Sequence, residues 1–363
     1  MSNIDKIEYS LFKVSNGTYS EMLDRLFSYA VCQHKILRLV FFCGICNNSE
    51  YILKESLLRK KAKNIWGDEL PVITLVPQKP LDSDITLEIH SYKSDSYDLI
   101  EYKSYKENPY VIVENECGRF LYAGGLHSSY DKDMYMQSVD VLETLGGILS
   151  KEGFPVNSIV RQWNYIENIT SFDSKGNQHY QMFNNARSKF YSKTKWDNGY
   201  PAATGIGTFG GGIIVDVDAV VGKDGFISIT PIDNKLQVAA HSYSDSVLEQ
   251  DVNGKTTPKF ERAKSLDING KRIVYISGTA AIRGEESLYD VGIVRQLEVT
   301  LENIRQLTGN SKVKLIRVYL KEKSFYDKVK KILSEENVMV SYLLSEVCRD
   351  ELLIEIEGIA LEL

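Results

Sequence analysis

The clearest alternation of apolar and polar residues lies near the end of the chain, in residues 352–360. Ile354 and Ile356 alternate there with Glu355 and Glu357, which is the pattern of a strand with one buried face and one polar face. Side chains two residues apart on a strand point the same way, so both carboxylates share one face. Such a face is often solvated, and the pattern alone leaves that role open.

Strand and helix signals recur in the same order in two stretches after residue 110. The helices are predicted from apolar residues at helical spacing, and each copy opens with a strand that ends in glycine. The first copy predicts a strand at 118–125, a helix at 132–150, a strand at 156–166, a helix at 178–191 and a strand at 213–219. The second predicts the same elements at 270–278, 291–307, 313–320, 324–334 and 352–358. In this comparison Asp216 takes the place of Glu355.

A duplicated β-α-β-α-β order predicts an α+β fold of repeated modules, each a mixed sheet with helices on one face. The helix-free faces must be buried, so we expect the modules to pack together with ligand sites in the clefts between them.

The opening segment is predicted to be a degenerate third module, which would make the chain a pseudo-trimer. It has strand signals at 35–43 and 70–76 and a basic helix signal at 49–63, while the polar stretch 93–108 is predicted to be a linker or a surface excursion. The predicted domains are 1–109, 110–222 and 223–363.

Composition and charge are those of a globular protein that has no general affinity for polyanions. The 363 residues are 43% hydrophobic and 25% charged, with a net charge of −6, so neither a nucleic acid nor an anionic membrane is an expected partner. Residues 1–6 lack a signal-peptide pattern, and no apolar run reaches the roughly 18 residues of a membrane span. We expect a cytoplasmic protein.

Motifs for metals and nucleotides are weak. Cys43 and Cys46 have CxxC spacing without a second pair of ligands, and the five histidines show no HExxH spacing, so we expect neither a metal nor a cofactor. Residues 205–210 fit GxGxxG, but Pro201 precedes them and a strand follows, whereas a dinucleotide loop lies between a strand and a helix. These glycines more plausibly allow a close approach of the backbone to a ligand or a strand.

Several motifs resemble known families. Residues 277–280 (SGTA), 317–320 (RVYL) and 354–360 (IEIEGIA) are similar to the Rid/YjgF family, small trimeric proteins with clefts between subunits. The whole chain resembles the chorismatases, which are built from Rid-like domains in one polypeptide. That resemblance is carried by the motifs at 161–166 (RQWNYI), 180–187 (YxxFNxxR), 200–207 (YPAATGIG) and 347–355 (VCR leading to LLIE).

The resemblance implies cleavage of chorismate to pyruvate and a hydroxybenzoate or a dihydroxycyclohexadiene carboxylate, without metal or cofactor. The family's catalytic glutamate falls on Glu355. An enol ether reacts once its methylene carbon is protonated, and a buried carboxylic acid with a raised pKa is a suitable donor. Glu357 is expected to be a solvated or structural carboxylate.

Residues that could bind a dicarboxylate lie in the same motifs. Arginine is suited to carboxylates because its planar fork donates two hydrogen bonds, although each arginine could equally lie at the surface or in an internal ion pair, and each tyrosine could serve packing alone. Cys348 is a candidate for tuning the product. The predicted substrate-binding residues are Arg161, Tyr165, Tyr180, Arg187, Tyr200, Cys348 and Arg349.

One region departs from the family. Chorismatases carry His, Gly and Asp before the long helix of the last copy, whereas residues 289–292 are Tyr-Asp-Val-Gly. The details of the pocket and the identity of the ring product therefore stay open. The sequence also leaves open whether the protein is a monomer or a homodimer. The alternative is a Rid-like protein without chorismatase activity, either a binder of small carboxylates or an imine deaminase. Arginines converging on Glu355 would distinguish a chorismatase from this alternative.

Overall fold

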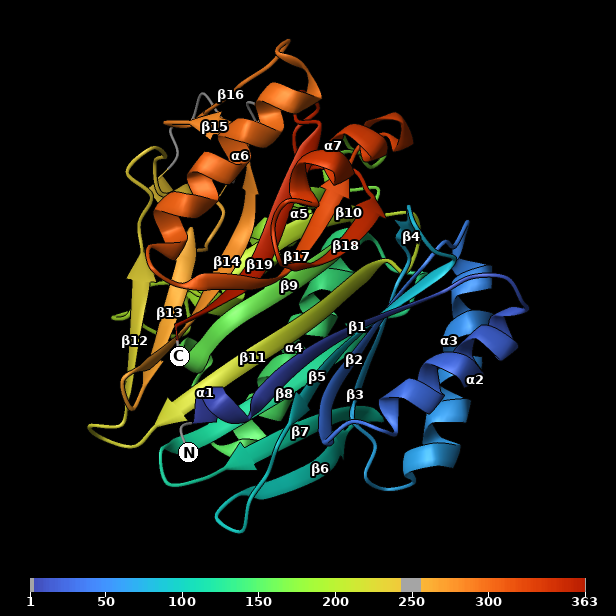
Figure 1. Cartoon of the computed structure of the whole chain (residues 1–363), viewed down its shortest axis with the longest axis vertical. Coiled ribbons are helices and arrows are strands. Elements are labelled where there is room, and N and C mark those ends of the chain that lie inside the picture. Colours follow the sequence, from blue (N-terminus) through green and yellow to red (C-terminus); the bar gives the residue numbers. More distant parts are fainter. Residues whose placement is uncertain (1–2, 243–255, 363) are drawn as a thin grey trace.

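The chain folds around three β-sheets, seen in Figure 1 in a computed structural model that describes residues 3–242 and 256–362. The first sheet has the order β1 (Ile7–Val14), β5 (Ile85–Tyr92), β2 (Lys35–Cys43) and β3 (Val72–Val76). The second has the order β10 (Ala202–Thr208), β9 (Ile159–Glu167), β11 (Ile213–Gly222), β8 (Gly118–His127), β7 (Asn108–Glu114) and β6 (Leu99–Tyr105). The third has the order β12 (Ile227–Ile232), β13 (Ala263–Ile268), β14 (Lys271–Ala280), β19 (Ile354–Glu362), β17 (Lys312–Leu320), β18 (Met339–Leu344) and β4 (Lys79–Pro80).

One four-stranded unit occurs in all three sheets. The orders β1-β5-β2-β3, β8-β11-β9-β10 and β14-β19-β17-β18 correspond, and in each the first two pairs are antiparallel and the last is parallel. We call the parts of the chain that carry them the first module (7–92), second module (99–222) and third module (227–362). The domain limits at residues 109 and 222 stay predictions.

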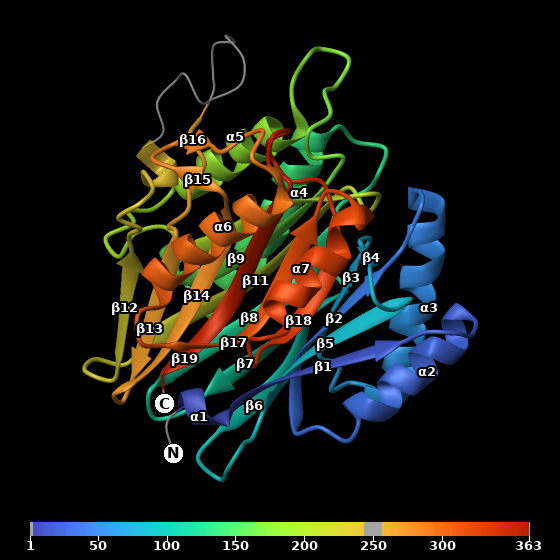
Figure 2. The ribbon, with the colours of Figure 1, turned by 45° about the horizontal axis from the view of Figure 1, so that its top comes forward.

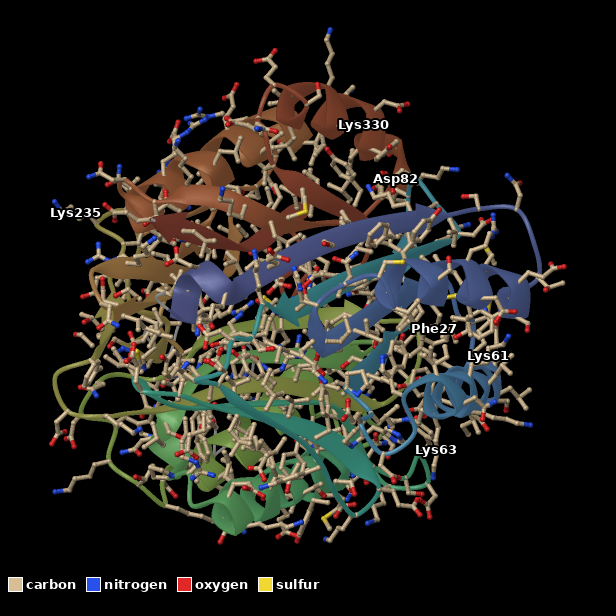
Figure 3. The ribbon with its side chains drawn as sticks, turned by 60° about the horizontal axis from the view of Figure 1, so that its bottom comes forward. Phe27, Lys61, Lys63, Asp82, Lys235 and Lys330 are labelled. Atoms are coloured by element: carbon tan, nitrogen blue, oxygen red, sulfur yellow. The ribbon has the colours of Figure 1, made fainter. Side chains whose placement is uncertain are left out.

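Two principal helices accompany each sheet. They are α2 (Tyr19–Ala30) and α3 (Asn48–Trp66), α4 (Met134–Glu152) and α5 (His179–Tyr191), and α6 (Gly292–Thr308) and α7 (Tyr326–Leu333). Figure 2 shows α6 and α7 lying over the strands of the third sheet, and Figure 3 shows the helices on the outer sides of the molecule with the sheets between them. The predicted α+β pseudo-trimer, with mixed sheets and helices on one face, is confirmed.

The last strand shows why this arrangement forms. Ile354 and Ile356 of β19 pack in one apolar cluster with Leu297 of α6 and Val329 of α7, so the apolar face of the strand lies under the helices. The opposite face carries Glu355 and is directed toward the other modules. The same alternation explains the stacking of three helix-covered sheets around a polar centre.

The linker alternative for residues 93–108 is wrong, and one helix of the opening segment was missed. The predicted linker 93–108 contains β6, which pairs with β7 along its whole length, because Ile100 and Tyr102 alternate with polar residues and pack on the core. Helix α2 was not predicted, although Thr18 and Glu21 form a capping box at its start.

No helix among the described residues is long and apolar enough to cross a membrane. The prediction of cellular location used residues 1–6. The first two of these residues, Met1 and Ser2, lie outside the described residues.

Candidate active site

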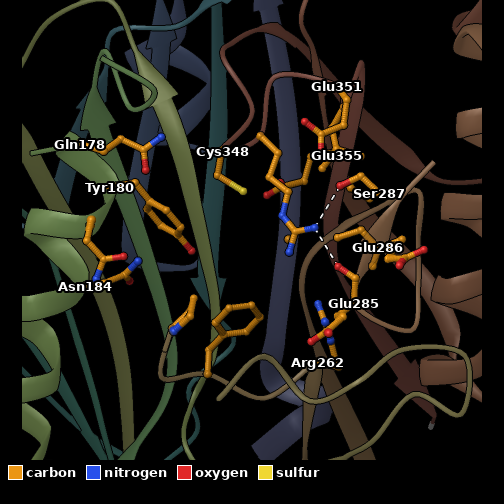
Figure 4. Close-up of a pocket in the computed structure, with 18 of the residues that line it drawn as sticks. Gln178, Tyr180, Asn184, Arg262, Glu285, Glu286, Ser287, Cys348, Glu351 and Glu355 are labelled. Carbon is orange, nitrogen blue, oxygen red and sulfur yellow. Dashed lines mark hydrogen bonds between the residues drawn. The ribbon is translucent and has the colours of Figure 1, made fainter. Parts of the chain in front are cut away.

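The main cavity lies between the second and third modules and has a volume of about 560 Å³. Helix α5 contributes Tyr180 and Asn184 to one wall, while the third module contributes Arg262, Cys348 and Glu355. Figure 4 shows Tyr180 and Asn184 facing Glu355 and Arg262 across the cavity, with Cys348 between the two walls. The cleft between modules is therefore a built pocket in which both walls are polar.

Glu355 lies on β19 with only 5% of its surface exposed. Its carboxyl group occupies space left by Gly278, where an added Cβ would stand 2.1 Å from Oε1. Among the described residues, no hydrogen-bond donor or cation pairs with this carboxyl. Burial, followed by the charge of Glu357, raises the pKa of Glu355 to about 8, so Glu355 holds a proton at neutral pH.

The equivalent carboxylates of the other two modules have partners. Strand register puts Glu88 on β5 and Asp216 on β11 at the position of Glu355. Glu88 accepts hydrogen bonds from Arg317 Nε at 2.9 Å and Nη2 at 2.7 Å. Although burial opposes it, the charge of Arg317 lowers the pKa of Glu88 well below its usual range. This carboxylate is therefore held as an anion.

The carboxylate of Asp216 also has hydrogen-bond partners. It accepts hydrogen bonds from Thr74 Oγ1 at 2.8 Å and from the backbone N–H of Gly125 at 2.8 Å, and Arg38 Nε lies 3.7 Å away. Of the three equivalent carboxyl groups, Glu355 alone lies without such a partner in the described part of the chain and borders the main cavity. This difference distinguishes the third module.

Two arginines contribute to the pocket wall. Arg349 Nη1 donates to the backbone oxygen of Glu285 at 2.9 Å and to Ser287 Oγ at 3.0 Å, and so holds the hairpin of β15 (Ile282–Arg283) and β16 (Glu286–Ser287) at the cavity. Arg262, which is 4% exposed, donates to the backbone oxygen of Val238 at 2.7 Å. Their charges converge on Glu355, since both lower its pKa against burial.

Four of the predicted site residues come together in the pocket: Tyr180, Cys348, Arg349 and Glu355. Burial raises the pKa of the Cys348 thiol to about 12, so Cys348 lines the cavity as a neutral thiol. Burial likewise raises the pKa of Tyr180, which leaves its hydroxyl protonated. Both are neutral hydrogen-bonding groups in a pocket whose cations, among the described residues, are Arg262 and Arg349.

Two other predicted residues, Arg161 and Tyr165, lie in the interior and not on the described pocket wall. Arg161 pairs with Glu357 and donates to Thr204 Oγ1 at 2.7 Å. The Tyr165 hydroxyl accepts from Arg317 Nη1 at 2.7 Å. Glu357 is buried among these groups, so the structural alternative for this carboxylate is the correct one and the solvated alternative is wrong.

The predicted residues Arg187 and Tyr200 are not among the residues that line the cavity. Arg187 Nη2 donates to Asn184 Oδ1 at 2.7 Å, so it supports a residue that does line the cavity. The ring of Tyr200 packs on Tyr191 and Trp196 at centroid distances of 6.0 and 5.2 Å. Arg187 therefore supports the wall from behind, whereas Tyr200 packs in an aromatic cluster.

Arg262 was missed by sequence reasoning. It precedes β13 in Phe260-Glu261-Arg262, outside the motifs that carry the resemblance and without a periodic signal. The glycines of 205–210 behave as predicted for close backbone approach, since an added Cβ on Gly205 would stand 2.8 Å from the Tyr180 ring and one on Gly207 would stand 2.7 Å from Glu346.

Replacing Gly278 by alanine should remove the space occupied by the Glu355 carboxyl. A methyl group there would lie 2.1 Å from Oε1 and 3.3 Å from Thr204 Cγ2, so the carboxyl must move. We expect activity to fall at least about tenfold with only a small loss of stability. Thermal unfolding and turnover measured on Gly278→Ala and on Gly44→Ala, whose Cβ would make only an ordinary contact of 3.5 Å with the Lys79 side chain, would separate this displacement from a general glycine effect; equal losses of turnover in both would contradict it.

The comparisons with known proteins agree with the motifs. The family model described as "Chorismatase FkbO/Hyg5-like, N-terminal" matches residues 110–219. A 3-hydroxybenzoate synthase from Streptomyces hygroscopicus is 30% identical over 234 residues, which cover 58% of this chain and 65% of the relative, just under two thirds of its length. A chorismatase from Streptomyces rapamycinicus is 28% identical over 256 residues, which cover 65% of this chain and 71% of the relative.

A solved crystal structure of a chorismatase shares the fold. It superposes with a TM-score of 0.69 at 20% sequence identity and covers 98% of this chain and 99% of that chain. The resemblance to the chorismatase family that the sequence motifs predict is therefore confirmed, with residues 110–219 matching its FkbO/Hyg5-like N-terminal domain.

Proposed function

We propose that this protein is a chorismatase that cleaves chorismate to pyruvate and a hydroxybenzoate or dihydroxycyclohexadiene carboxylate. The observation that carries the proposal is the buried, protonated Glu355 on the wall of a 560 Å³ cavity that also presents Arg262 and Arg349. Such a set provides one proton donor and two cations for a substrate with two carboxylates. The names of the similar proteins, a 3-hydroxybenzoate synthase and a chorismatase, support the same substrate.

In the proposed mechanism Glu355 gives its proton to the terminal methylene carbon of the enolpyruvyl group. The C=C electron pair forms the new C–H bond, and the ether carbon becomes an oxocarbenium ion next to the Glu355 carboxylate. Adding water at this carbon gives a hemiketal, which collapses to pyruvate and the ring diol while Glu355 is reprotonated. Alternatively, the C–O bond between the ring and the enolpyruvyl group breaks and releases pyruvate, and the ring then loses a proton, which returns to Glu355, and aromatises to a hydroxybenzoate with no net consumption of water.

Arg262 and Arg349 are proposed to hold the two substrate carboxylates. Both belong to the third module, as Glu355 does, and all three line the cavity, so a bound dianion would be oriented with its enol ether toward the acid. Tyr180 and Asn184 on α5 face the ring from the opposite wall and can bond its hydroxyl group. Cys348 lies between the walls and is the candidate for tuning the ring product.

The direct test is to incubate the purified protein with chorismate. Pyruvate release would be followed with a coupled lactate dehydrogenase assay, and the ring product would be identified by chromatography against the three candidate standards. We expect pyruvate and one ring product in equal amounts. Absence of pyruvate would contradict the proposal and leave the alternative, a Rid-like carboxylate binder or imine deaminase. The convergence of two arginines on Glu355 argues against that alternative.

Replacing Arg349 by lysine should weaken substrate binding more than it slows chemistry. Lysine keeps the charge but cannot donate in a planar fork, and a lost charge-assisted hydrogen bond costs about 1.5–3 kcal/mol, or roughly 10- to 150-fold. We therefore expect KM for chorismate to rise by that factor with a smaller change in kcat. Arg295→Lys, at a surface arginine paired with Glu298, is the matched control, and an unchanged KM in Arg349→Lys would remove Arg349 from the binding site.

We also propose that the protein works in the cytoplasm as a monomer or homodimer. The pocket is complete within one chain, with both walls supplied by modules of the same polypeptide.

A further inference from the structure

A second carboxylate lies two residues from Glu355 and is buried in a dense set of donors. Glu357 is 1% exposed. Its Oε2 accepts hydrogen bonds from Arg161 and Thr204, and its Oε1 accepts from Arg317 Nη1 at 3.1 Å and from the Tyr319 hydroxyl. The four donors come from β9, β10 and β17, so this carboxylate joins the second and third modules.

The partners of Glu357 define its charge. All four act as donors to the carboxylate and two are arginines, so the acceptor-only, ionised form satisfies every contact. Glu355 and Glu357 share a strand face, which separates their Cα atoms by about 6.6 Å. A fixed anion at that distance in a buried site disfavours a second anion.

We propose that Glu357 is a positioning residue for the proton donor: its anchored, ionised carboxylate repels the ionised form of Glu355 and so keeps the Glu355 carboxyl protonated for the reaction. This inference rests on the proposed function, because it assigns a role within that reaction. It assigns to Arg161 the task of anchoring Glu357 instead of binding substrate.

The charges around Glu355 oppose one another. Burial raises its pKa most, the Glu357 carboxylate adds to this, and Arg161, Arg262 and Arg349 act against both. Tyr180 from α5, Cys348, and the carboxylates Glu285, Glu286 and Glu351 also border the cavity. Glu357 is an anion that offsets its own partner Arg161 and the two arginines that border the cavity, Arg262 and Arg349.

The other modules show that this arrangement is special to the third. The position of Glu357 is taken by Asp218 in the second module and by His90 in the first, since the three pair with Arg317, Arg161 and Arg38 in equivalent registers. Asp218 accepts from Arg38 Nη1 at 2.7 Å but lies beside Asp216, which already has partners. Within the described residues, the combination of an anchored anion with an unpaired neighbour is therefore found in the third module, whose Glu355 lines the pocket.

The test is the pH dependence of kcat/KM for chorismate in Glu357→Gln. Removing the anion and leaving Arg161 uncompensated both favour ionised Glu355, so we expect the decline of activity on the alkaline side to begin at least one pH unit lower than in the wild type. Relative to the wild type, activity would then fall at least about fivefold at pH 8 but stay within about threefold near pH 5.5. Asp218→Asn is the matched control, because it removes a buried, arginine-paired carboxylate from the other module and should leave the pH profile in place.

Arg161→Gln provides a second variant, in which the alkaline decline of kcat/KM is expected to shift in the opposite direction. It removes a cation that favours ionised Glu355 while Arg317 and Tyr319 still hold Glu357, so the alkaline decline should move to higher pH. KM should change little, whereas a role of Arg161 in binding substrate would raise KM without moving the profile. If Glu357→Gln does not fold, an Arg161→Gln profile that moves to lower pH, or does not move, would contradict the inference.

A readout independent of turnover is the infrared C=O stretch of the protonated Glu355 carboxyl, assigned by its loss in Glu355→Gln and followed from pH 5 to 10. We expect this band to vanish at lower pH in Glu357→Gln than in the wild type. Equal titration of the band in both proteins, or an equal shift in Asp218→Asn, would overturn the inference. Absence of pyruvate from the wild type would instead defeat the proposed function, which the infrared titration does not depend on.

Discussion

Glu355→Gln should abolish pyruvate release from chorismate and yet make the folded protein more stable at alkaline pH. Glutamine keeps the size of the side chain but cannot give a proton to carbon, so we expect turnover to fall about 100- to 10,000-fold, the range that general acids contribute. The gain in stability follows because a buried carboxyl without a cation partner destabilises the fold whenever it must ionise. Loss of function and gain of stability in one variant would mark an active-site acid.

The pH range of the stability effect follows from the direction of the pKa shift. The pKa of Glu355 is raised from an ordinary value of 4.5 to about 8 in the folded protein. Its contribution is therefore fully present below about pH 4.5, declines as the unfolded chain ionises, and is lost once pH passes about 8. We expect Glu355→Gln to match the wild type near pH 4.5 and to exceed it by a few kcal/mol at pH 9.

Urea unfolding at pH 5, 7 and 9 would measure this difference. Glu298→Gln, at an exposed carboxylate of α6 paired with Arg295, is the control for a simple change of net charge and should be nearly neutral at all three pH values. A Glu355→Gln protein that is less stable than the wild type at pH 9, or that still releases pyruvate at the wild-type rate, would contradict the assignment.

Arg317→Met should produce the largest loss of stability among the substitutions considered. The Arg317 guanidinium pairs with Glu88 of the first module, with Glu357 of the third and with the Tyr165 hydroxyl of the second. Removing it leaves two buried carboxylates short of their shared cation. Breaking a single buried pair already costs about 3–5 kcal/mol, so we expect a loss at or above that range.

Urea unfolding of the purified variant measures this loss, with Arg305→Met on an exposed site of α6 as the matched control. Adding Glu88→Gln to Arg317→Met should recover part of the stability, because it removes one of the two stranded charges, and the double-mutant cycle gives the coupling directly. A loss below about 1 kcal/mol in Arg317→Met would show that the three modules are not joined through this arginine.

The sequence was sufficient to predict most of the repeat. Helices α4 and α6 and strands β11 and β19 lie where their apolar spacing predicts them, because a helix or strand buried on one face must carry the matching period. The first module was harder to recognise. Its first helix was missed and its boundary with the second module was read as a linker, since β6 is an edge strand in which polar and apolar residues alternate weakly.

Only part of the site could be predicted from the sequence, and the reason is physical. Glu355, Cys348 and Arg349 lie close together along the chain, so one strand and the turn before it place them at the same pocket. Arg161 carries the same chemistry as Arg349, but its partner Glu357 lies 196 residues away in sequence. Only the register and packing of three sheets determine whether such an arginine reaches a substrate or a buried carboxylate.

Equivalent positions in the three modules differ in a way that neither the sequence motifs nor the hydrophobic periodicity reveals. Glu88 and Asp216 are as deeply buried as Glu355, and all three carry the same functional group. Arg317 and Thr74 satisfy the first two, whereas the space next to Glu355 opens into the cavity. The chemical difference between the three modules therefore lies in the partners of a carboxylate and not in the residue itself.

The most direct test of the central claim is the pH profile of kcat/KM for chorismate in the wild-type protein. If the protonated Glu355 is the acid, kcat/KM should be constant below about pH 8 and fall tenfold per pH unit above it, following the pKa of the free protein. A rate that stays constant to pH 10, or that rises through pH 8, would contradict the account, because the working form of the protein would not carry that proton.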